Sequence, residues 1–569
     1  MSGSASFHKR NVLEQSPWIC DIFTNGTTMQ AAGIHSVELI FLLLLLFVAT
    51  LAALAKRLKV SYPIVLVIGG LILSFFPRVP RVDLNPNVMF LVVLPPLLFS
   101  SAFLTSWRDF RYNLVSIAML AFGLVGFTVL GVAAASRWIL PGFNWRMGLV
   151  LGAVVSTTDV IATTSIARRL GMPKRITDVL EGESLANDAT GLLALEFATA
   201  LLVSGRTPTL AEGAGRLLYL IFGSIAIGLL IAKLIHMFES AIDDAPIEIT
   251  ISLLAPYFAY LAAESAHSSG VLATVACGFY LGHRSSLYFS TGARLKSGAV
   301  WDTLTFVLNG FVFILIGLQL PWILEGIRTM SLGGLLILGV LFSGVVILLR
   351  FLWVYPGAWA SNLIRRRVLH QPEPLPNPRS IFIVGWAGMR GVIALAAAIS
   401  LPEVLNNGAA FPQREVMIFL TFCVIFVTLV LQGLTLPPLI RYLGMAGVVG
   451  GNPEEEKARR AMVEAALTYL EHARDEDQPE FAPVYDELIH FERHRLHLVS
   501  DSASQETGHR PEDYKRFRDL SRQVRAVQRA AILNLRNENE INDEVMRKFE
   551  HELDSVEARF EASRDSLKN

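Results

Sequence analysis

The stretch that decides the fold reads Glu181-Gly-Glu-Ser-Leu-Ala-Asn-Asp-Ala-Thr190, and it runs directly into the apolar segment 191–203. Its acidic and amide side chains therefore stand at the start of a predicted membrane-spanning helix. A charged side chain near the bilayer centre costs about 3 kcal/mol, so such residues normally face a cavity or a partner. The stretch therefore predicts a polar pathway through a helical membrane protein.

Helical spacing sorts these polar side chains into two columns. Glu183 and Asn187 are four residues apart, as are Ser184 and Asp188, so each pair lies on one face of the helix. Ser184 and Asp188 offer oxygen ligands of the kind that suit hard cations. Glu183 and Asn187 lie on the neighbouring face of the helix, where they can support these ligands. The alternative is that these residues only cap a helix start, where Ser, Asp and Asn are common.

Composition predicts that the chain is a polytopic membrane protein. The chain has 569 residues, of which 53% are hydrophobic, and a mean hydropathy of +0.47, which is too apolar for an ordinary soluble protein. Its formal net charge is zero, so nothing in the charge balance favours a nucleic-acid partner. Cys20, Cys277 and Cys423 lie far apart and predict neither a disulfide framework nor a zinc site.

Runs of mostly apolar residues predict about thirteen transmembrane helices. A polar N-terminal segment, 1–35, precedes the membrane domain, 36–440, and we expect the first apolar run to be a retained helix and not a cleaved signal. The predicted spans are 36–55, 60–76, 88–105, 113–135, 147–166, 184–204, 216–237, 247–265, 268–283, 300–321, 333–355, 380–400 and 415–439.

Positive charge in short loops predicts the orientation. With the N-terminus outside, the cytoplasmic loops carry Lys56-Arg57, Arg108, Arg168-Arg169, Arg294 and Arg365-Arg366-Arg367, whereas Arg78 and Arg81 go against the trend. An odd number of spans then leaves the C-terminus in the cytoplasm.

The composition changes abruptly after the last span to a charged tail, 451–569. Apolar residues within 514–567 have the spacing of amphipathic helices, and the charges around them are mixed in sign. We therefore expect a solvated helical hairpin or small bundle in preference to a dedicated ligand-binding domain.

Two other predicted spans contain polar groups where lipid-facing sequence would not. The fifth contains Thr158-Asp159 at its middle, and the twelfth contains Gly388-Met-Arg390-Gly391. Ser and Thr also mediate ordinary helix contacts, and an arginine near a helix end can snorkel, but the positions within the spans favour a cavity. A buried arginine needs an anionic partner, for which Glu183 is the obvious candidate. Spans five and twelve are seven apart in order, as expected of two inverted repeats whose broken helices cross at the midplane.

These motifs together resemble those of the monovalent cation:proton antiporter family, the sodium/proton exchangers, in its bacterial form. The resemblance rests on Glu183-Ser-Leu-Ala-Asn187-Asp188, Thr158-Asp159, Gly388-Met-Arg390-Gly391, Leu94-Pro-Pro-Leu-Leu-Phe99 and Leu308-Asn-Gly-Phe311, and it covers roughly 36–440. It implies an all-α fold of inverted repeats with crossed discontinuous helices, a dimerisation domain beside a mobile core domain, and a homodimer.

The resemblance also implies roles for individual residues. Asp188 would bind either the cation or the proton, and Ser184 and the main chain around Thr158 would add oxygen ligands for Na⁺. Asp159 and Asn187 would bond to each other across the crossing helices, and Glu183 would pair with Arg390.

Two residues depart from the family pattern. Ser100 stands where many relatives have an acidic residue, which puts an accessory carboxylate from the third span in doubt. Val160 replaces the proline of the family's Thr-Asp-Pro, so the helix must break without it.

We therefore predict a multi-pass cell-membrane transporter, not an enzyme, that exchanges Na⁺ or Li⁺, with K⁺ left open, for H⁺ by alternating access at Asp188. An asparagine beside that carboxylate leaves one charge to serve both ions, which predicts electroneutral exchange. No cofactor is expected; the partners are the transported ions and membrane lipids. The alternative is a cation channel, or a sensor that signals through the tail. Glu196 and Glu264 are further intramembrane acids with no assigned role.

Overall fold

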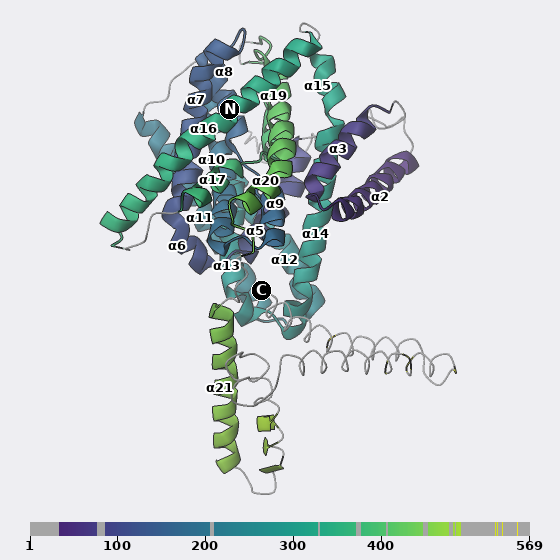
Figure 1. The fold of residues 1–569 in the computed structure, drawn as a ribbon, viewed down its shortest axis with the longest axis vertical. Helices are drawn as coiled ribbons and strands as arrows, with labels where there is room; N and C mark the ends of the chain where they lie inside the picture. The colour runs from purple at the N-terminus through teal and green to yellow at the C-terminus, as the bar shows by residue number, and fades with distance from the viewer. Residues whose placement is uncertain are drawn as a thin grey trace, which may run out of the picture. The chain divides into compact units, whose positions relative to one another are not determined.

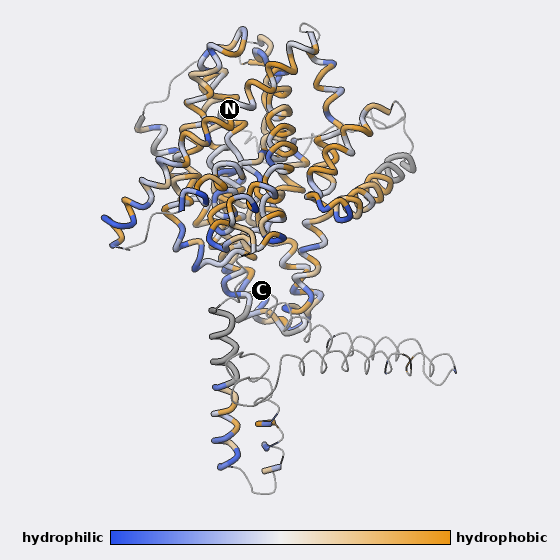
Figure 2. Tube along the Cα trace, viewed as in Figure 1, coloured by the Kyte–Doolittle hydropathy of each residue, from blue (hydrophilic) through white to orange (hydrophobic). Residues whose placement is uncertain are grey.

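The computed structural model describes residues 34–76, 86–204, 210–327, 331–370, 377–405, 408–447 and 453–476, with scattered residues beyond 481. The chain divides into two compact units, Met1–Ala446 and Gly447–Asn569. Ribbon and hydropathy views show the first unit as a bundle of mostly apolar helices (Figures 1 and 2). In the second unit, α21 (Pro453–Glu476) is a polar helix, and the predicted amphipathic helices of 514–567 lie almost entirely outside the described residues.

The first half of the membrane unit contains eleven helical elements within the described ranges. They are α2 (Ile34–Leu58), α3 (Tyr62–Ser74), α4 (Pro86–Val88), η3 (Met89–Val93), α5 (Leu94–Leu104), α6 (Trp107–Ala118), η4 (Met119–Leu124), α7 (Val125–Ile139), α8 (Trp145–Ser156), α9 (Ile161–Leu170) and α10 (Lys174–Ser204).

The second half continues with elements of the same kind. They are α11 (Leu210–Glu239), α12 (Ala245–Ser265), α13 (Gly270–Tyr288), α14 (Thr291–Leu318), α15 (Leu320–Gly326), α16 (Leu332–Arg367), α17 (Pro378–Trp386), α18 (Val392–Ile399), α19 (Arg414–Val427), η5 (Thr428–Gln432) and α20 (Gly433–Tyr442).

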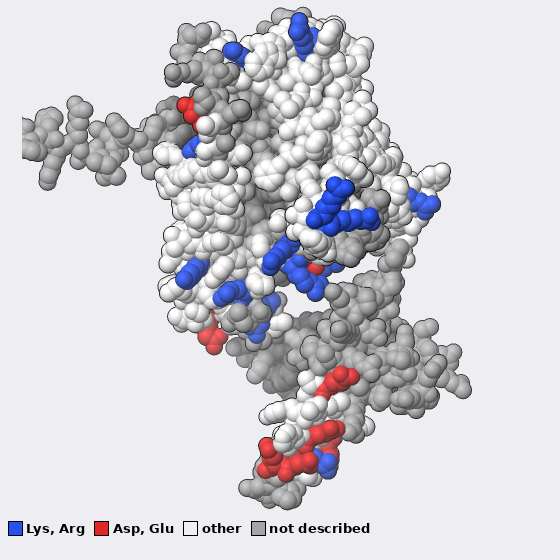
Figure 3. Space-filling model, turned by 90° about the vertical axis from the view of Figure 1, so that its left-hand side faces the viewer, with Lys and Arg blue, Asp and Glu red and all other residues white. Residues whose placement is uncertain are grey.

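Length and composition agree with an all-helical membrane protein. Within the described residues, ten segments are long and apolar enough to cross a bilayer, and Tyr62–Ser74 is a shorter apolar helix. Each of the thirteen predicted spans overlaps a helix or a pair of half-helices, although the number thirteen itself stays a prediction. The surface in Figure 3 also agrees with a membrane protein, because a broad uncharged band separates a few Lys and Arg side chains from a larger group of them.

One predicted boundary is wrong in a way that matters. The sixth span was expected to begin at residue 184, but α10 begins at Lys174. Lys174, Arg175, Asp178 and Glu181 lower the hydropathy of its first turns and so hide them from a search for apolar runs. The polar stretch 181–190 therefore lies inside a helix of 31 residues, and its side chains do not cap a helix start.

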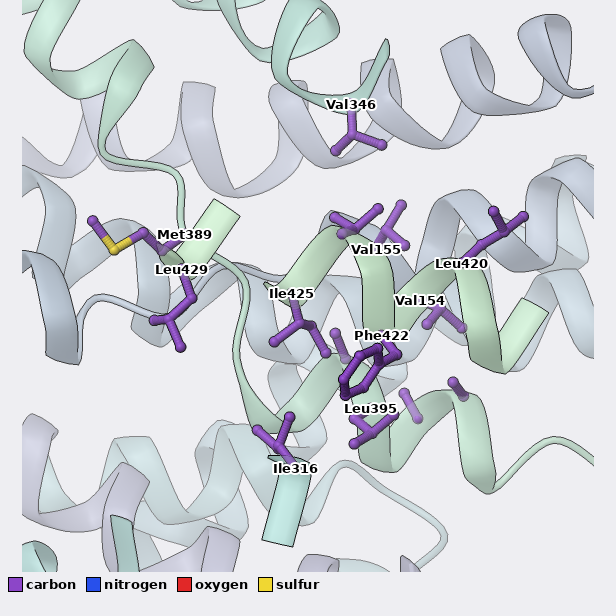
Figure 4. Close-up of a cluster of buried hydrophobic side chains, with 14 of the residues drawn as sticks. Val154, Val155, Ile316, Val346, Met389, Leu395, Leu420, Phe422, Ile425 and Leu429 are labelled. Atoms are coloured by element: carbon purple, nitrogen blue, oxygen red, sulfur yellow. The ribbon is translucent and has the colours of Figure 1, made fainter. Parts of the chain in front are cut away.

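Two pairs of half-helices form the centre of the bundle. α8 stops at Ser156 and α9 starts at Ile161, whereas α17 stops at Trp386 and α18 starts at Val392. The half-helices α8 and α18 both pack against α19. Figure 4 shows the apolar side chains at this contact, among them Val155, Leu395 and Ile425, which are at most 1% exposed. Since lipid is as apolar as these side chains, close packing and not exclusion from water holds the helices together.

Several loops that were predicted to be cytoplasmic meet at one end of the bundle. The Arg169 guanidinium donates to the Lys59 carbonyl over 2.6 Å, and Lys174 pairs with Asp109. Arg168 pairs with Glu181 over 3.1 Å. We call this end, which carries Lys59, Arg108, Arg168, Arg169 and Lys174, the basic face.

Candidate functional site

The site is built where the two helix breaks cross. The Asp159 backbone N–H donates to the Met389 carbonyl over 2.7 Å, which joins one unwound segment directly to the other. The Thr163 hydroxyl adds a 3.3 Å hydrogen bond to the Ala387 carbonyl. A side chain at Gly391 would collide with the Asp159 carboxylate, so only glycine allows this close approach. The break thus forms without the family's proline, because the crossing segment satisfies the freed backbone groups.

Charges at the crossing complement the helix ends. Asp159 accepts the Ile161 N–H over 2.8 Å at the start of α9, and it lies against Gly391 at the start of α18. Arg390 donates to the Val155 carbonyl over 3.2 Å at the end of α8, and to the Gly388 carbonyl just beyond α17. A carboxylate at positive helix N-termini and a guanidinium at negative C-termini are each stabilised by the helix dipoles. Asp159 and Arg390 therefore hold the crossing together.

The predicted pair between Glu183 and Arg390 is wrong. Glu183 pairs with Arg350 of α16 through both carboxylate oxygens, one of them at 2.8 Å, and both side chains are 1% exposed. Arg350 also donates to the Val384 carbonyl near the end of α17. Carbonyl groups at helix ends satisfy Arg390 instead, so it needs no carboxylate.

Arg350 is the functional residue that sequence reasoning missed. It is the one charged side chain in the otherwise apolar run 332–364, and it is fully buried. A lone charge inside a membrane span normally has a buried partner, so this signal was present in the sequence.

The predicted bond between Asp159 and Asn187 is also wrong. The Asn187 amide donates to the Thr158 hydroxyl, which in turn donates to Glu183 over 3.4 Å. Asp159 is turned toward the start of α9 and accepts the Ile161 N–H instead. The Asn187 side-chain oxygen is buried without a hydrogen-bond partner among the described residues. A chain of hydrogen bonds, which we call the relay, thus runs through Asn187, Thr158 and Glu183 and ends at Arg350.

Asp188 lies in a cavity of about 290 Å³ beside this relay. Ser184, Thr157, Thr158 and Asp159 line the same cavity, so the structure brings together the three predicted ligands Asp188, Ser184 and Thr158. The Ser184 hydroxyl donates to the Thr158 carbonyl over 2.9 Å, which leaves its oxygen facing the cavity as an acceptor. Asp188 is 5% exposed, and its carboxylate has no hydrogen bond within the described parts of the chain.

The donors around Asp188 suit a small monovalent cation. They are carboxylate and hydroxyl oxygens, which hard cations prefer. The buried Thr157 hydroxyl has no hydrogen-bond partner in the described structure, so one more oxygen is available. Across the described residues, no group of three or more His, Cys, Asp or Glu side chains could hold a metal ion.

The cavity opens toward the basic face. Its lining continues from Asp188 past Ser101 and Thr105 to Glu181 and Arg168, whose side chains are 22% and 75% exposed. Ser100 lines it as well, but its hydroxyl donates to the Leu97 carbonyl over 3.0 Å. No carboxylate from α5 therefore supports Asp188, as the departure from the family pattern indicated.

Comparison with known proteins agrees with the all-helical membrane fold. Residues 42–442 match the model of the transmembrane sodium/hydrogen exchanger family. An uncharacterized Na⁺/H⁺ exchanger of Mycobacterium tuberculosis is 34% identical over 521 residues, covering 89% of this chain and 93% of that protein. A sodium, potassium, lithium and rubidium/H⁺ antiporter of Bacillus pumilus is 32% identical over 462 residues, covering 78% and 67%. The solved sodium proton antiporter of Methanocaldococcus jannaschii shares the fold, with a TM-score of 0.58 at 19% identity over 71% of this chain and 97% of that one.

Proposed function

This chain belongs to the sodium/hydrogen exchanger family, and we propose that it exchanges one Na⁺ or Li⁺ for one H⁺ at Asp188, which faces the two sides of the membrane in turn. The proposal rests on the surroundings of the Asp188 carboxylate. It is almost fully buried, lines a polar cavity, and has no hydrogen bond among the described residues. A buried carboxylate without a partner has to take up either a cation or a proton.

The neighbouring groups support a single exchangeable charge. Asp159 is engaged with the Ile161 N–H, and Glu183 is engaged with Arg350, so each has a partner within the protein. The residue before Asp188 is Asn187, which supplies no second carboxylate. One carboxylate then carries the same net charge with Na⁺ bound as with H⁺ bound. Exchange is therefore electroneutral in this proposal.

Ser184, Thr158 and Thr157 are the proposed additional oxygen ligands for the cation. Their hydroxyl and carbonyl groups line the cavity with Asp188, whereas Asp159, Asn187, Glu183 and Arg390 support the crossing or the relay. The relative from Bacillus pumilus is named for sodium, potassium, lithium and rubidium, so K⁺ belongs in the test beside Na⁺ and Li⁺.

Assembly and orientation complete the proposal. We propose a homodimer in the cell membrane, as the family resemblance implies, with the basic face and the C-terminal tail in the cytoplasm. The meeting of the positively charged loops at one end of the bundle supports this orientation.

The proposal is tested in vesicles that contain the purified protein and a pH-sensitive dye. Addition of Na⁺ or Li⁺ should drive proton movement, and clamping the membrane potential at zero or at a negative value should leave the initial rate unchanged. A rate that follows the clamped potential would contradict the one-for-one exchange. Cation flux that is not accompanied by counter-movement of protons would identify a channel instead.

A further inference from the structure

A π-helical turn contacts α10 two residues beyond Asp188. It is η4 (Met119–Leu124), which lies between α6 and α7 and packs against both α10 and α16. Ala121 of this turn is fully buried. Turns of this kind are rare overall and frequent at functional sites. The turn is therefore a candidate for a role in the exchange, although none of its residues lines the cavity around Asp188.

Two side chains from neighbouring helices donate to carbonyl groups of this turn. The Thr190 hydroxyl of α10 donates to the Ala121 carbonyl over 2.7 Å, and it also reaches the Asn187 carbonyl over 3.1 Å. The Trp353 indole N–H of α16 donates to the Met119 carbonyl over 2.9 Å. Inside a membrane span such a bond is hard to replace, because lipid offers no partner. The turn is thus tied to α10 and to α16 by one hydrogen bond each.

The Trp353 ring fits closely against the turn. A side chain at Gly123 would collide with the ring, so glycine allows the indole to reach the turn. The ring also packs against Phe127 of α7, with 5.2 Å between the ring centroids. Trp353 is three residues beyond Arg350, whose guanidinium pairs with Glu183 of α10, so one face of α16 carries both contacts. The helices α10 and α16 and the turn are therefore joined to one another in pairs.

These contacts all attach to one face of α10. Glu183, Asn187 and Thr190 are spaced i, i+4 and i+7, so their side chains lie within about 60° of one another around the helix axis. Ser184 and Asp188 lie on average about 110° away from them. A rotation of α10 about its axis would move both columns together. Because the first column is fixed to α16 and to the turn, the second column is held facing the cavity.

We propose that Thr190 and Trp353 are positioning residues, which act through the π-helical turn to fix the rotation of α10 at which Asp188 faces its cavity. This inference rests on the proposed exchange at Asp188. Binding of Na⁺ needs several oxygen atoms at the right distances at once, whereas a proton needs only one carboxylate oxygen. A looser α10 therefore binds the cation more weakly and binds the proton as before.

The Thr190 hydroxyl is tested with Thr190→Val, which keeps the branched shape and removes the donor. At a pH high enough that protons do not compete, the Na⁺ concentration for half-maximal exchange should rise about fivefold. The pH below which this concentration begins to climb should stay the same. Thr190→Ser keeps a hydroxyl and should behave as the wild type. Thr250→Val is the matched control, because the exposed Thr250 hydroxyl makes a 2.7 Å bond to the Pro246 carbonyl within its own helix.

Trp353→Phe tests the other side of the turn independently. It keeps a ring against Gly123 and removes the N–H donor, so it should also raise the half-saturating Na⁺ concentration without moving the onset pH. Because both residues act through one turn, the rise in the double variant should be smaller than the product of the two single rises. A full product would remove the turn from the proposal. Trp359→Phe is the matched control, because Trp359 on α16 is 62% exposed.

Two results would overturn the positioning role. One is a half-saturating Na⁺ concentration that stays at the wild-type value in folded Thr190→Val and Trp353→Phe proteins. The other is an onset pH that moves together with the Na⁺ affinity, which would show that the carboxylate itself is disturbed. Size-exclusion profiles check folding, and if one variant does not fold, the other decides. Failure of the proposed exchange looks different, because Asp188→Asn vesicles would then stay active whatever the Thr190 and Trp353 variants do.

Discussion

Asp188→Asn vesicles are expected to show no proton movement when Na⁺ or Li⁺ is added. The asparagine side chain has nearly the same shape, so it should fit the cavity beside Ser184 and Thr158. It bears no charge and binds no proton near neutral pH, and therefore it can neither balance a cation nor carry H⁺. The loss of activity should be complete, because the neighbouring carboxylates of Asp159 and Glu183 are each engaged with a partner within the protein. The measurement is dye dequenching in vesicles that contain equal amounts of folded protein.

The matched control for this variant is Asp243→Asn. Asp243 is exposed between α11 and α12, outside the cavity, so its replacement should leave the rate unchanged. Size-exclusion profiles of the two variants should be the same as that of the wild type. Cation-driven proton movement in the Asp188→Asn protein would remove Asp188 from the centre of the mechanism.

Arg350→Met is expected to have the largest effect on stability. The substitution leaves the Glu183 carboxylate buried without its guanidinium partner, and breaking a buried ion pair in this way costs about 3–5 kcal/mol. It also removes the hydrogen bonds to the Val384 carbonyl. The variant should unfold at a clearly lower temperature in detergent and should give little folded protein. Thermal unfolding followed by size-exclusion chromatography measures the change.

Two further variants separate charge from packing. Glu183→Gln with Arg350→Met removes both charges and should recover much of the lost stability, because no unpaired charge remains. Arg367→Met changes an exposed arginine of the same helix and should have little effect. If Arg350→Met alone is as stable as the wild type, the buried pair does not hold α16 to α10.

The sequence predicted the parts of the site that depend on helical spacing. Ser184 and Asp188 are four residues apart on α10, and they do line one cavity. The polar groups in spans five and twelve correctly indicated two broken helices that meet at their breaks. These features are visible because a polar residue inside an apolar run has few positions that it can occupy in a membrane.

The same reasoning could not identify the partners of the charged side chains at the crossing. Sequence reasoning assigned a carboxylate partner to Arg390, because a sequence shows which side chains are charged but does not show the partial charges at helix ends. Those partial charges exist only once α8 and α17 have stopped at the crossing, where the Val155 carbonyl at the end of α8 and the Gly388 carbonyl just beyond α17 accept from Arg390. With Arg390 satisfied there, Glu183 is left for Arg350, which comes from a helix more than 160 residues away in the chain.

The central claim is that Na⁺ and H⁺ occupy the same carboxylate by turns, and the pH dependence of the apparent Na⁺ affinity tests it most directly. In wild-type vesicles with equal pH on both sides, the Na⁺ concentration that gives half the maximal exchange rate should rise as the pH falls. The rise should approach about tenfold per pH unit once the carboxylate is mostly protonated, with the maximal rate at saturating Na⁺ restored, because Na⁺ must displace a proton. A half-saturating concentration that does not change with pH, while the maximal rate falls, would show that the two ions bind at separate sites and would contradict the claim.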